Sequence, residues 1–107
     1  MNIMATKQDI ARIASDIVDG TVDVLAGCQA IVRLRGELAV PDATDPDLLV
    51  LVAIESELDD VPSGDVRNYW DSAALARTDA EEATYLRKSL PEILRACRGL
   101  SARWRSA

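Results

Sequence analysis

The apolar residues of the last third of the chain recur at the spacing of one face of an α-helix. They are Ala83, Leu86, Leu90, Ile93, Leu94, Cys97, Leu100 and Trp104. Residues three and four apart share a helix face, so this stripe predicts a long amphipathic helix that begins at a capping box in residues 78–81. Pro91 falls inside the stripe without shifting its phase. This predicts one kinked helix, and a second capping pattern at residues 89–92 leaves a full break as the alternative.

Two earlier stripes predict helices over residues 6–19 and 22–36. Gly20 lies between them and is a natural left-handed stop. Gly27 falls inside the second helix, where a glycine costs about 1 kcal/mol relative to alanine. We interpret Gly27 as a point of close packing between two helices.

A further helix is expected over residues 46–57. Asp45 followed by Pro46 has the pattern of a capping residue and a first helical residue. Its expected buried face is Leu48, Leu49, Val52 and Ala53. The β-branched residues of this segment make a buried strand the alternative, but no other segment offers a strand to pair with it. The sequence of residues 65–70 predicts a short helix.

These elements predict an all-α fold, a small antiparallel bundle of four main helices and one short helix, with residues 1–107 as a single helical domain. The chain has no Phe, two Trp and two Tyr, so its core must be aliphatic. The predicted core residues are Ile13, Ile17, Leu25, Ile31, Leu49, Val52, Leu86, Leu90, Ile93 and Leu100.

The chain contains no histidine, which excludes Ser-His-Asp and Cys-His catalysis and histidine metal ligands. Its two cysteines, Cys28 and Cys97, each fall on an apolar stripe and are expected to be buried, reduced thiols. No phosphate-cradling glycine loop is present. We therefore expect a protein that is not an enzyme and needs no cofactor. A carboxylate-based hydrolase that binds a divalent metal is the alternative.

No signal peptide is visible at the N-terminus, and the longest apolar run, residues 48–54, is too short to span a bilayer. A cytoplasmic protein without a membrane partner is the expectation.

The net charge of −6 is unevenly distributed along the chain. Residues 36–76 hold ten acidic side chains and a single basic one, whereas residues 77–107 hold seven basic and four acidic ones. The acidic residues gather around a loop expected at residues 58–64. Three interpretations of this acidic loop stay open: a solubilising surface, a docking site for a cationic protein, or a divalent-cation site.

The candidate partner-binding residues lie in and beside this loop. We expect Arg67 to clamp the carboxylates of Glu55, Glu57 or Asp59, because it is the only cation among the ten acids. Tyr69 and Trp70 are expected to anchor the loop onto the bundle, or to add binding energy if exposed. The full candidate set is Glu55, Glu57, Asp59, Asp60, Asp65, Arg67, Tyr69 and Trp70.

The C-terminal segment is basic, with Arg95, Arg98, Arg103 and Arg105. Binding of nucleic acid by this Arg-rich helix is an alternative function, although cations in a last helix are expected from the helix dipole and the acidic middle would repel phosphates. The basic tail can instead pair with the acidic middle, within the fold or in a weak homodimer.

The stretch from residue 54 to residue 70 resembles a pattern in a family of small, uncharacterised bacterial helical proteins. The pattern is an apolar run, Ser-Glu-x-Asp, Pro-x-Gly, then Arg and Trp, carried here by Ser56, Glu57, Asp59, Pro62, Gly64, Arg67 and Trp70. Leu58 stands where the family has Thr. In size and acidity the chain also resembles immunity proteins that neutralise toxins, which implies a toxin-neutralising interaction protein.

Overall fold

The computed structural model describes residues 6–38, 45–58 and 64–106. Within these ranges the chain forms four α-helices and one 3-10 helix, and no strand. The elements are α1 (Lys7–Asp19), α2 (Val24–Arg35), α3 (Pro46–Glu57), η1 (Gly64–Tyr69) and α4 (Ser72–Trp104). The predicted all-α class is confirmed. The strand alternative for residues 48–54 is wrong, because this segment lies inside α3.

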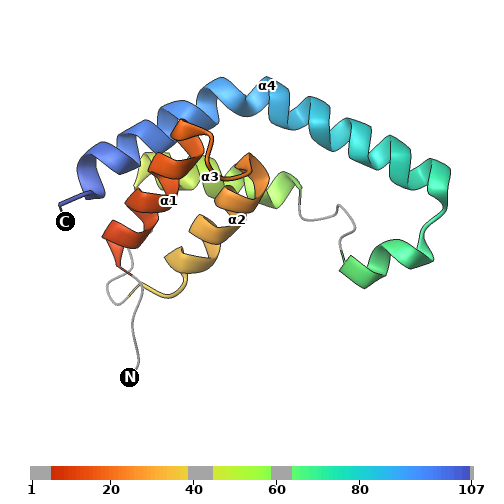
Figure 1. The fold of residues 1–107 in the computed structure, drawn as a ribbon, viewed down its shortest axis with the longest axis horizontal. Coiled ribbons are helices and arrows are strands. Elements are labelled where there is room, and N and C mark those ends of the chain that lie inside the picture. Colours follow the sequence, from red (N-terminus) through yellow and green to blue (C-terminus); the bar gives the residue numbers. More distant parts are fainter. Residues whose placement is uncertain (1–5, 39–44, 59–63, 107) are drawn as a thin grey trace.

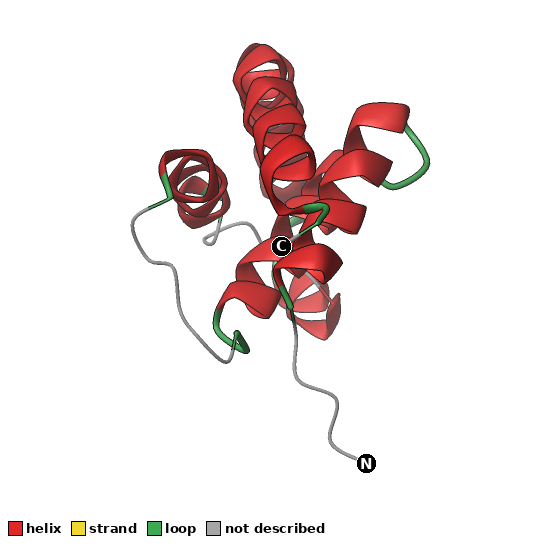
Figure 2. Ribbon diagram, turned by 90° about the vertical axis from the view of Figure 1, so that its left-hand side faces the viewer, coloured by secondary structure: helices red, strands yellow, loops and turns green. Residues whose placement is uncertain are grey.

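The long helix α4 organises the fold. It packs against α1 and α3, and α2 packs against both of these helices. The buried residues of α4 all lie in its C-terminal half, which therefore makes the core contacts. Figure 1 shows α4 curving over the three shorter helices, with its N-terminal part and η1 extending past them. Figure 2, turned by 90°, shows α4 above the shorter helices. We call the extending part, residues 64–80, the arm.

Capping interactions between residues close in the sequence fix both ends of α1 and the start of α3. Thr6 and Asp9 form a capping box at the start of α1, and Gly20 ends the helix in the left-handed conformation with a φ of 79°. Asp45 caps α3 with its carboxylate, which accepts two backbone N–H groups of the first turn, and Pro46 is the first helical residue. The predicted stop at Gly20 and the predicted start at Asp45 and Pro46 are confirmed.

The prediction that the last helix begins at the capping box of residues 78–81 is wrong. Asp71 caps α4 instead, and its carboxylate accepts a hydrogen bond of 3.2 Å from the backbone N–H of Ala74. The segment from Ser72 to Ala76 is rich in alanine, which is the strongest helix former, so the helix starts there and includes Thr78 in its interior.

Pro91 does not break α4, which runs as one helix from Ser72 to Trp104. A proline inside a helix removes one backbone donor and crowds the preceding turn. Ile93, Ala96 and Cys97 follow it directly and are fully buried, so the turns on its C-terminal side are held by the core. The predicted single helix is confirmed.

The core is aliphatic, as the composition requires, apart from Trp104. Among the predicted core residues, Ile17, Ile31, Ile93 and Leu100 are buried. Five more are half-buried: Ile13, Leu25, Val52, Leu86 and Leu90. The buried hydrophobic residues are Ile10, Ala11, Ala14, Ile17, Cys28, Ile31, Leu38, Leu48, Leu51, Ile54, Leu58, Ile93, Ala96, Cys97, Leu100 and Trp104.

The buried face of α3 differs from the predicted one. Leu48, Leu51 and Ile54 face the core, whereas Leu49 is 43% exposed and Ala53 is exposed. The helix is apolar on almost every side between residues 48 and 54, so its sequence indicates no preferred inward direction. Packing against α2 and α4 decides which side is buried.

Close packing at Gly27 and burial of both cysteines are confirmed. A Cβ atom at Gly27 would lie 2.6 Å from two side-chain carbons of Ile17, so α2 meets α1 with no room for a side chain. Cys28 and Cys97 are free and fully buried. Burial raises the pKa of the Cys28 thiol to about 11 and that of the Cys97 thiol to about 12. Among the described helices, none has the length and apolar character needed to cross a bilayer.

Candidate interaction surfaces

The structure places the candidate binding residues in two regions. Glu55 and Glu57 lie in the last turn of α3. Asp65, Arg67 and Tyr69 lie on η1 and Trp70 directly follows it, in the arm, and Figure 1 shows η1 well away from the end of α3. Asp59 and Asp60 lie outside the described residues. The described candidate residues thus lie on two elements, the last turn of α3 and the segment from Asp65 to Trp70.

Arg67 has an ion-pair partner that the sequence analysis missed. Its Nη1 and Nη2 atoms donate hydrogen bonds of 3.1 and 2.9 Å to the two carboxylate oxygens of Asp79. These bonds lower the pKa of Asp79 and raise the pKa of Arg67. The expected partners were Glu55, Glu57 or Asp59. Asp59 lies outside the described residues, so the expected clamp on its carboxylate stays a prediction. The Arg67–Asp79 pair ties η1 to the first turns of α4 and organises the arm.

The aromatic side chains of the arm face solvent. Tyr69 is 89% exposed and Trp70 is 42% exposed, and Val66 on the same short segment is exposed as well. The expectation that Tyr69 anchors this segment onto the bundle is therefore wrong, whereas more than half of the Trp70 surface is covered. The anchoring tryptophan is Trp104, which is buried at the far end of α4 with the Lys7 ammonium 5.1 Å from its ring centre. Large exposed aromatic residues that cluster are typical of interaction surfaces.

A hollow lined by carboxylates lies between the end of α3 and the middle of α4. Its lining combines one glutamate of α3 with two of α4, together with apolar and hydroxyl groups: Glu57, Leu58, Thr78, Glu81, Glu82 and Tyr85. None of these residues is basic. We call it the acidic hollow. The sequence analysis did not include Glu81 and Glu82 among the candidate binding residues, because they belong to a segment that is basic overall. Their spacing from Thr78 and Tyr85 nevertheless places all four residues near one side of α4.

A second hollow lies between α1 and the C-terminal end of α4. Its lining includes two arginines, Arg12 and Arg105, and the hydroxyl groups of Ser15 and Ser101. Among the described residues that line it, Asp16 is the only acidic one. We call it the basic hollow. The Arg12 guanidinium lies 3.6 Å from the Asp9 carboxylate on the same helix and stays largely exposed.

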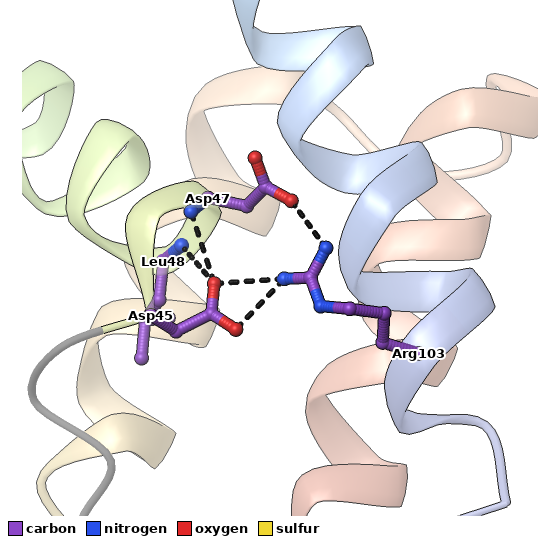
Figure 3. A network of polar contacts seen from close by, with 4 residues as sticks. All are labelled: Asp45, Asp47, Leu48 and Arg103. Atoms are coloured by element: carbon purple, nitrogen blue, oxygen red, sulfur yellow. Dashed lines mark hydrogen bonds and ion pairs between the residues drawn. The ribbon is translucent and has the colours of Figure 1, made fainter.

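A third polar cluster joins the start of α3 to the end of α4 and is shown in Figure 3. Arg103 donates hydrogen bonds of 2.8 and 2.7 Å to the two carboxylate oxygens of Asp45, and one of 2.6 Å to Asp47. Gly99 makes this possible, because a Cβ atom there would collide with the Asp47 carboxylate. These bonds raise the pKa of Arg103. The predicted pairing of the basic tail with the acidic middle thus occurs within the fold, through Arg103.

This third cluster is structural rather than a binding site. Asp45 is already the cap of α3 and is buried, so its carboxylate has both backbone and guanidinium partners. Among the described residues, no group of three or more Cys, Asp or Glu side chains is arranged to hold a metal ion. Comparison with protein-family models, curated proteins and solved structures found no match.

Proposed function

We propose that this protein is a non-enzymatic interaction module whose acidic hollow binds a basic segment of a partner protein. The observation that carries the proposal is the convergence of Glu57 from α3 with Glu81 and Glu82 from α4 around one hollow. The packing of α3 against α4 fixes the backbone positions from which these three side chains extend, so the helices need not rearrange when a partner binds.

The chemistry of the hollow suits an arginine or lysine side chain. Its carboxylates accept charge-assisted hydrogen bonds from the cationic head, and the apolar stem of the cation can lie on Leu58. The ring of Tyr85 offers a face for a guanidinium. A cluster of negative charge also steers a basic partner and raises its association rate by roughly 10- to 1,000-fold at low salt.

Toxin neutralisation is the most concrete form of this function. A nuclease active site is basic because it binds phosphates, and a rigid set of carboxylates can occupy that site in place of the substrate. The resemblance in size and acidity to immunity proteins supports this form of the proposal.

The test is capture of the partner with a charge-matched control. The chain is immobilised and exposed to lysate of the source cell, and the bound proteins are identified by mass spectrometry. The hollow variant is Glu57→Gln, Glu81→Gln and Glu82→Gln. The control variant loses the same net charge elsewhere, through Asp19→Asn, Glu37→Gln and Glu92→Gln.

We expect a partner with a basic surface that binds the wild type and the control alike, and the hollow variant at least about tenfold more weakly, which corresponds to about 1.4 kcal/mol. A partner that binds all three forms equally refutes the acidic hollow as its site. The toxin form is tested by expressing the captured partner in a host cell: growth arrest that the wild-type chain relieves supports it, and growth arrest that it does not relieve excludes it.

A further inference from the structure

The basic hollow is polar, although a groove between two packed helices is ordinarily lined by apolar side chains. It has a volume of about 500 Å³, and Ala11 is the only apolar residue among the described residues that line it. The others are Gln8, Arg12, Ser15, Asp16, Ser101 and Arg105. Sites for small ligands have volumes of about 300–1,000 Å³. The basic hollow is therefore large enough for a small polar ligand.

Two serine hydroxyl groups line the basic hollow, that of Ser15 on α1 and that of Ser101 on α4. Both side chains are half-buried. The hydroxyl of Thr84 donates to a backbone carbonyl one turn earlier in α4. Those of Ser15 and Ser101 make no such bond, and none to any other described residue. A half-buried hydroxyl without a protein partner bonds to water or to a ligand, so two donors are available in the hollow.

Two guanidinium groups line the same hollow, and neither is held by a strong ion pair. The Arg12 side chain is 71% exposed, and its Nη2 atom lies 3.6 Å from the Asp9 carboxylate. Such exposed pairs contribute little to stability. Arg105 is exposed and forms no ion pair with a described residue. Both guanidinium groups can therefore turn toward an anion bound between them.

The donors of the hollow match a phosphate monoester better than a carboxylate. A phosphate monoester has three terminal oxygens and a charge of about −1.5 to −2 at pH 7. Two arginines balance that charge, and their forked N–H groups and the two hydroxyls can donate to all three oxygens, whereas a carboxylate has only two. The half-buried carboxylate of Asp16 repels a second anionic group but accepts hydrogen bonds from ligand hydroxyls. The hollow thus suits one phosphate joined to a hydroxylated body.

We propose that the basic hollow binds a small phosphate monoester that carries hydroxyl groups, a sugar phosphate or a nucleotide. Arg12, Arg105 and the two serine hydroxyls hold the phosphate. The Asp16 carboxylate and the Gln8 amide bind hydroxyl groups of the ligand. The described linings of the basic and acidic hollows share no residue, so this ligand and the basic partner of the proposed function bind independently.

An NMR titration of the isotope-labelled full chain measures the affinity and locates the site. The probes are glucose 6-phosphate, AMP, inorganic phosphate, glucose and glucuronate. Glucuronate carries a carboxylate where glucose 6-phosphate carries its phosphate, and glucose carries neither. The hollow variant is Arg12→Gln with Arg105→Gln. The control variant, Arg77→Gln with Arg87→Gln, removes the same charge from exposed positions of α4 outside the hollow.

We expect at least one of the two organic monoesters to bind with a dissociation constant of about 1 mM or below and to shift the amide signals of residues 8–16 and 101–105. The tighter of the two shows whether the ligand is a sugar phosphate or a nucleotide. Glucose, glucuronate and the hollow variant should each bind at least about tenfold more weakly, and the control variant should bind as the wild type does. Asp16→Ala should remove the preference for that monoester over inorganic phosphate.

The proposal is refuted if neither organic monoester shifts these signals at about 10 mM. It is also refuted by glucuronate that binds as tightly as glucose 6-phosphate and AMP, or by binding that the hollow and control variants weaken alike. An oligonucleotide without a terminal phosphate that shifts the same signals at lower concentration than AMP would assign the hollow to nucleic acid and overturn it as well. None of these results bears on the acidic hollow, whose residues remain unchanged in every variant.

Discussion

Replacing Arg103 by methionine should destabilise the fold substantially, because it leaves two carboxylates without their cation. The Asp45 side chain is 7% exposed and sits beside that of Asp47, and the guanidinium donates three hydrogen bonds to the pair. Methionine keeps much of the apolar stem of arginine, so the change isolates the charged group.

The expected loss in the free energy of unfolding follows from how deeply the ion pair of Arg103 and Asp45 is buried. Removing one partner of a fully buried ion pair costs about 3–5 kcal/mol, because the other charge stays buried without compensation. The Arg103 side chain is 45% exposed, so water reaches the site and replaces part of the lost interaction. Asp45 also keeps its two backbone hydrogen bonds. We therefore expect a loss of about 2 kcal/mol in the free energy of unfolding, or about 10 °C in melting temperature for a chain of this size.

The assay is urea and thermal unfolding at pH 7, followed by circular dichroism, for a double-mutant cycle of Arg103→Met and Asp45→Asn. Asparagine keeps the helix cap but removes the charge. The double variant should therefore be more stable than the sum of the single losses predicts, by about 1 kcal/mol or more. Strictly additive losses, or a loss below about 0.5 kcal/mol for Arg103→Met, would refute this account of the cluster.

Three further predictions test the packing, the thiols and the arm. Gly27→Ala should lower the free energy of unfolding by up to about 2 kcal/mol in urea titrations, because overpacking against a buried isoleucine of α1 costs about 1–3 kcal/mol and alanine regains about 1 kcal/mol of helix propensity. Gly36→Ala, which meets only one backbone oxygen at 3.5 Å, should change it little. The thiols of Cys28 and Cys97 should react slowly with an aromatic disulfide reagent at pH 8, and rapid labelling of the native protein would contradict their burial. The contribution of these thiols to stability should be constant below pH 9 and fall between pH 9 and about 12, because the unfolded chain ionises its thiols first. Asp79→Asn should speed hydrogen exchange of the η1 amides while leaving α1 unchanged, and equal exchange in both forms would show that the ion pair does not hold η1.

Much of the secondary structure could be predicted from local patterns. The stop at Gly20 and the start at Asp45 depend on interactions within a few residues of the chain, and so does the stripe that identified α4. The start of α4 was misplaced because two capping patterns, at Asp71 and at residues 78–81, compete within one segment. The alanine-rich stretch between them favours the earlier start, and the helix then includes the later pattern in its interior.

The candidate sites were predicted less well, because they depend on which faces meet. Tyr69 and Trp70 were identified as binding residues if exposed, and the structure exposes them. Asp79, which pairs with Arg67, lies twelve positions away on another helix, and nothing in the local sequence distinguishes it from nearer acids. Glu81 and Glu82 are 24 and 25 positions from Glu57, so their common hollow exists only after α3 has packed against α4.

The sequence by itself determined the helical class, the aliphatic core and the uneven charge, because helix formation and apolar periodicity are properties of neighbouring residues. The tertiary structure alone decided which side of α3 is buried and that the arm presents its aromatic side chains to solvent. It also decided that Arg103 donates hydrogen bonds to Asp45 and Asp47, in space that the missing side chain of Gly99 leaves. These features depend on contacts between helices far apart in the chain, and a helix such as α3, apolar on almost every side, packs in whichever orientation its neighbours leave room for.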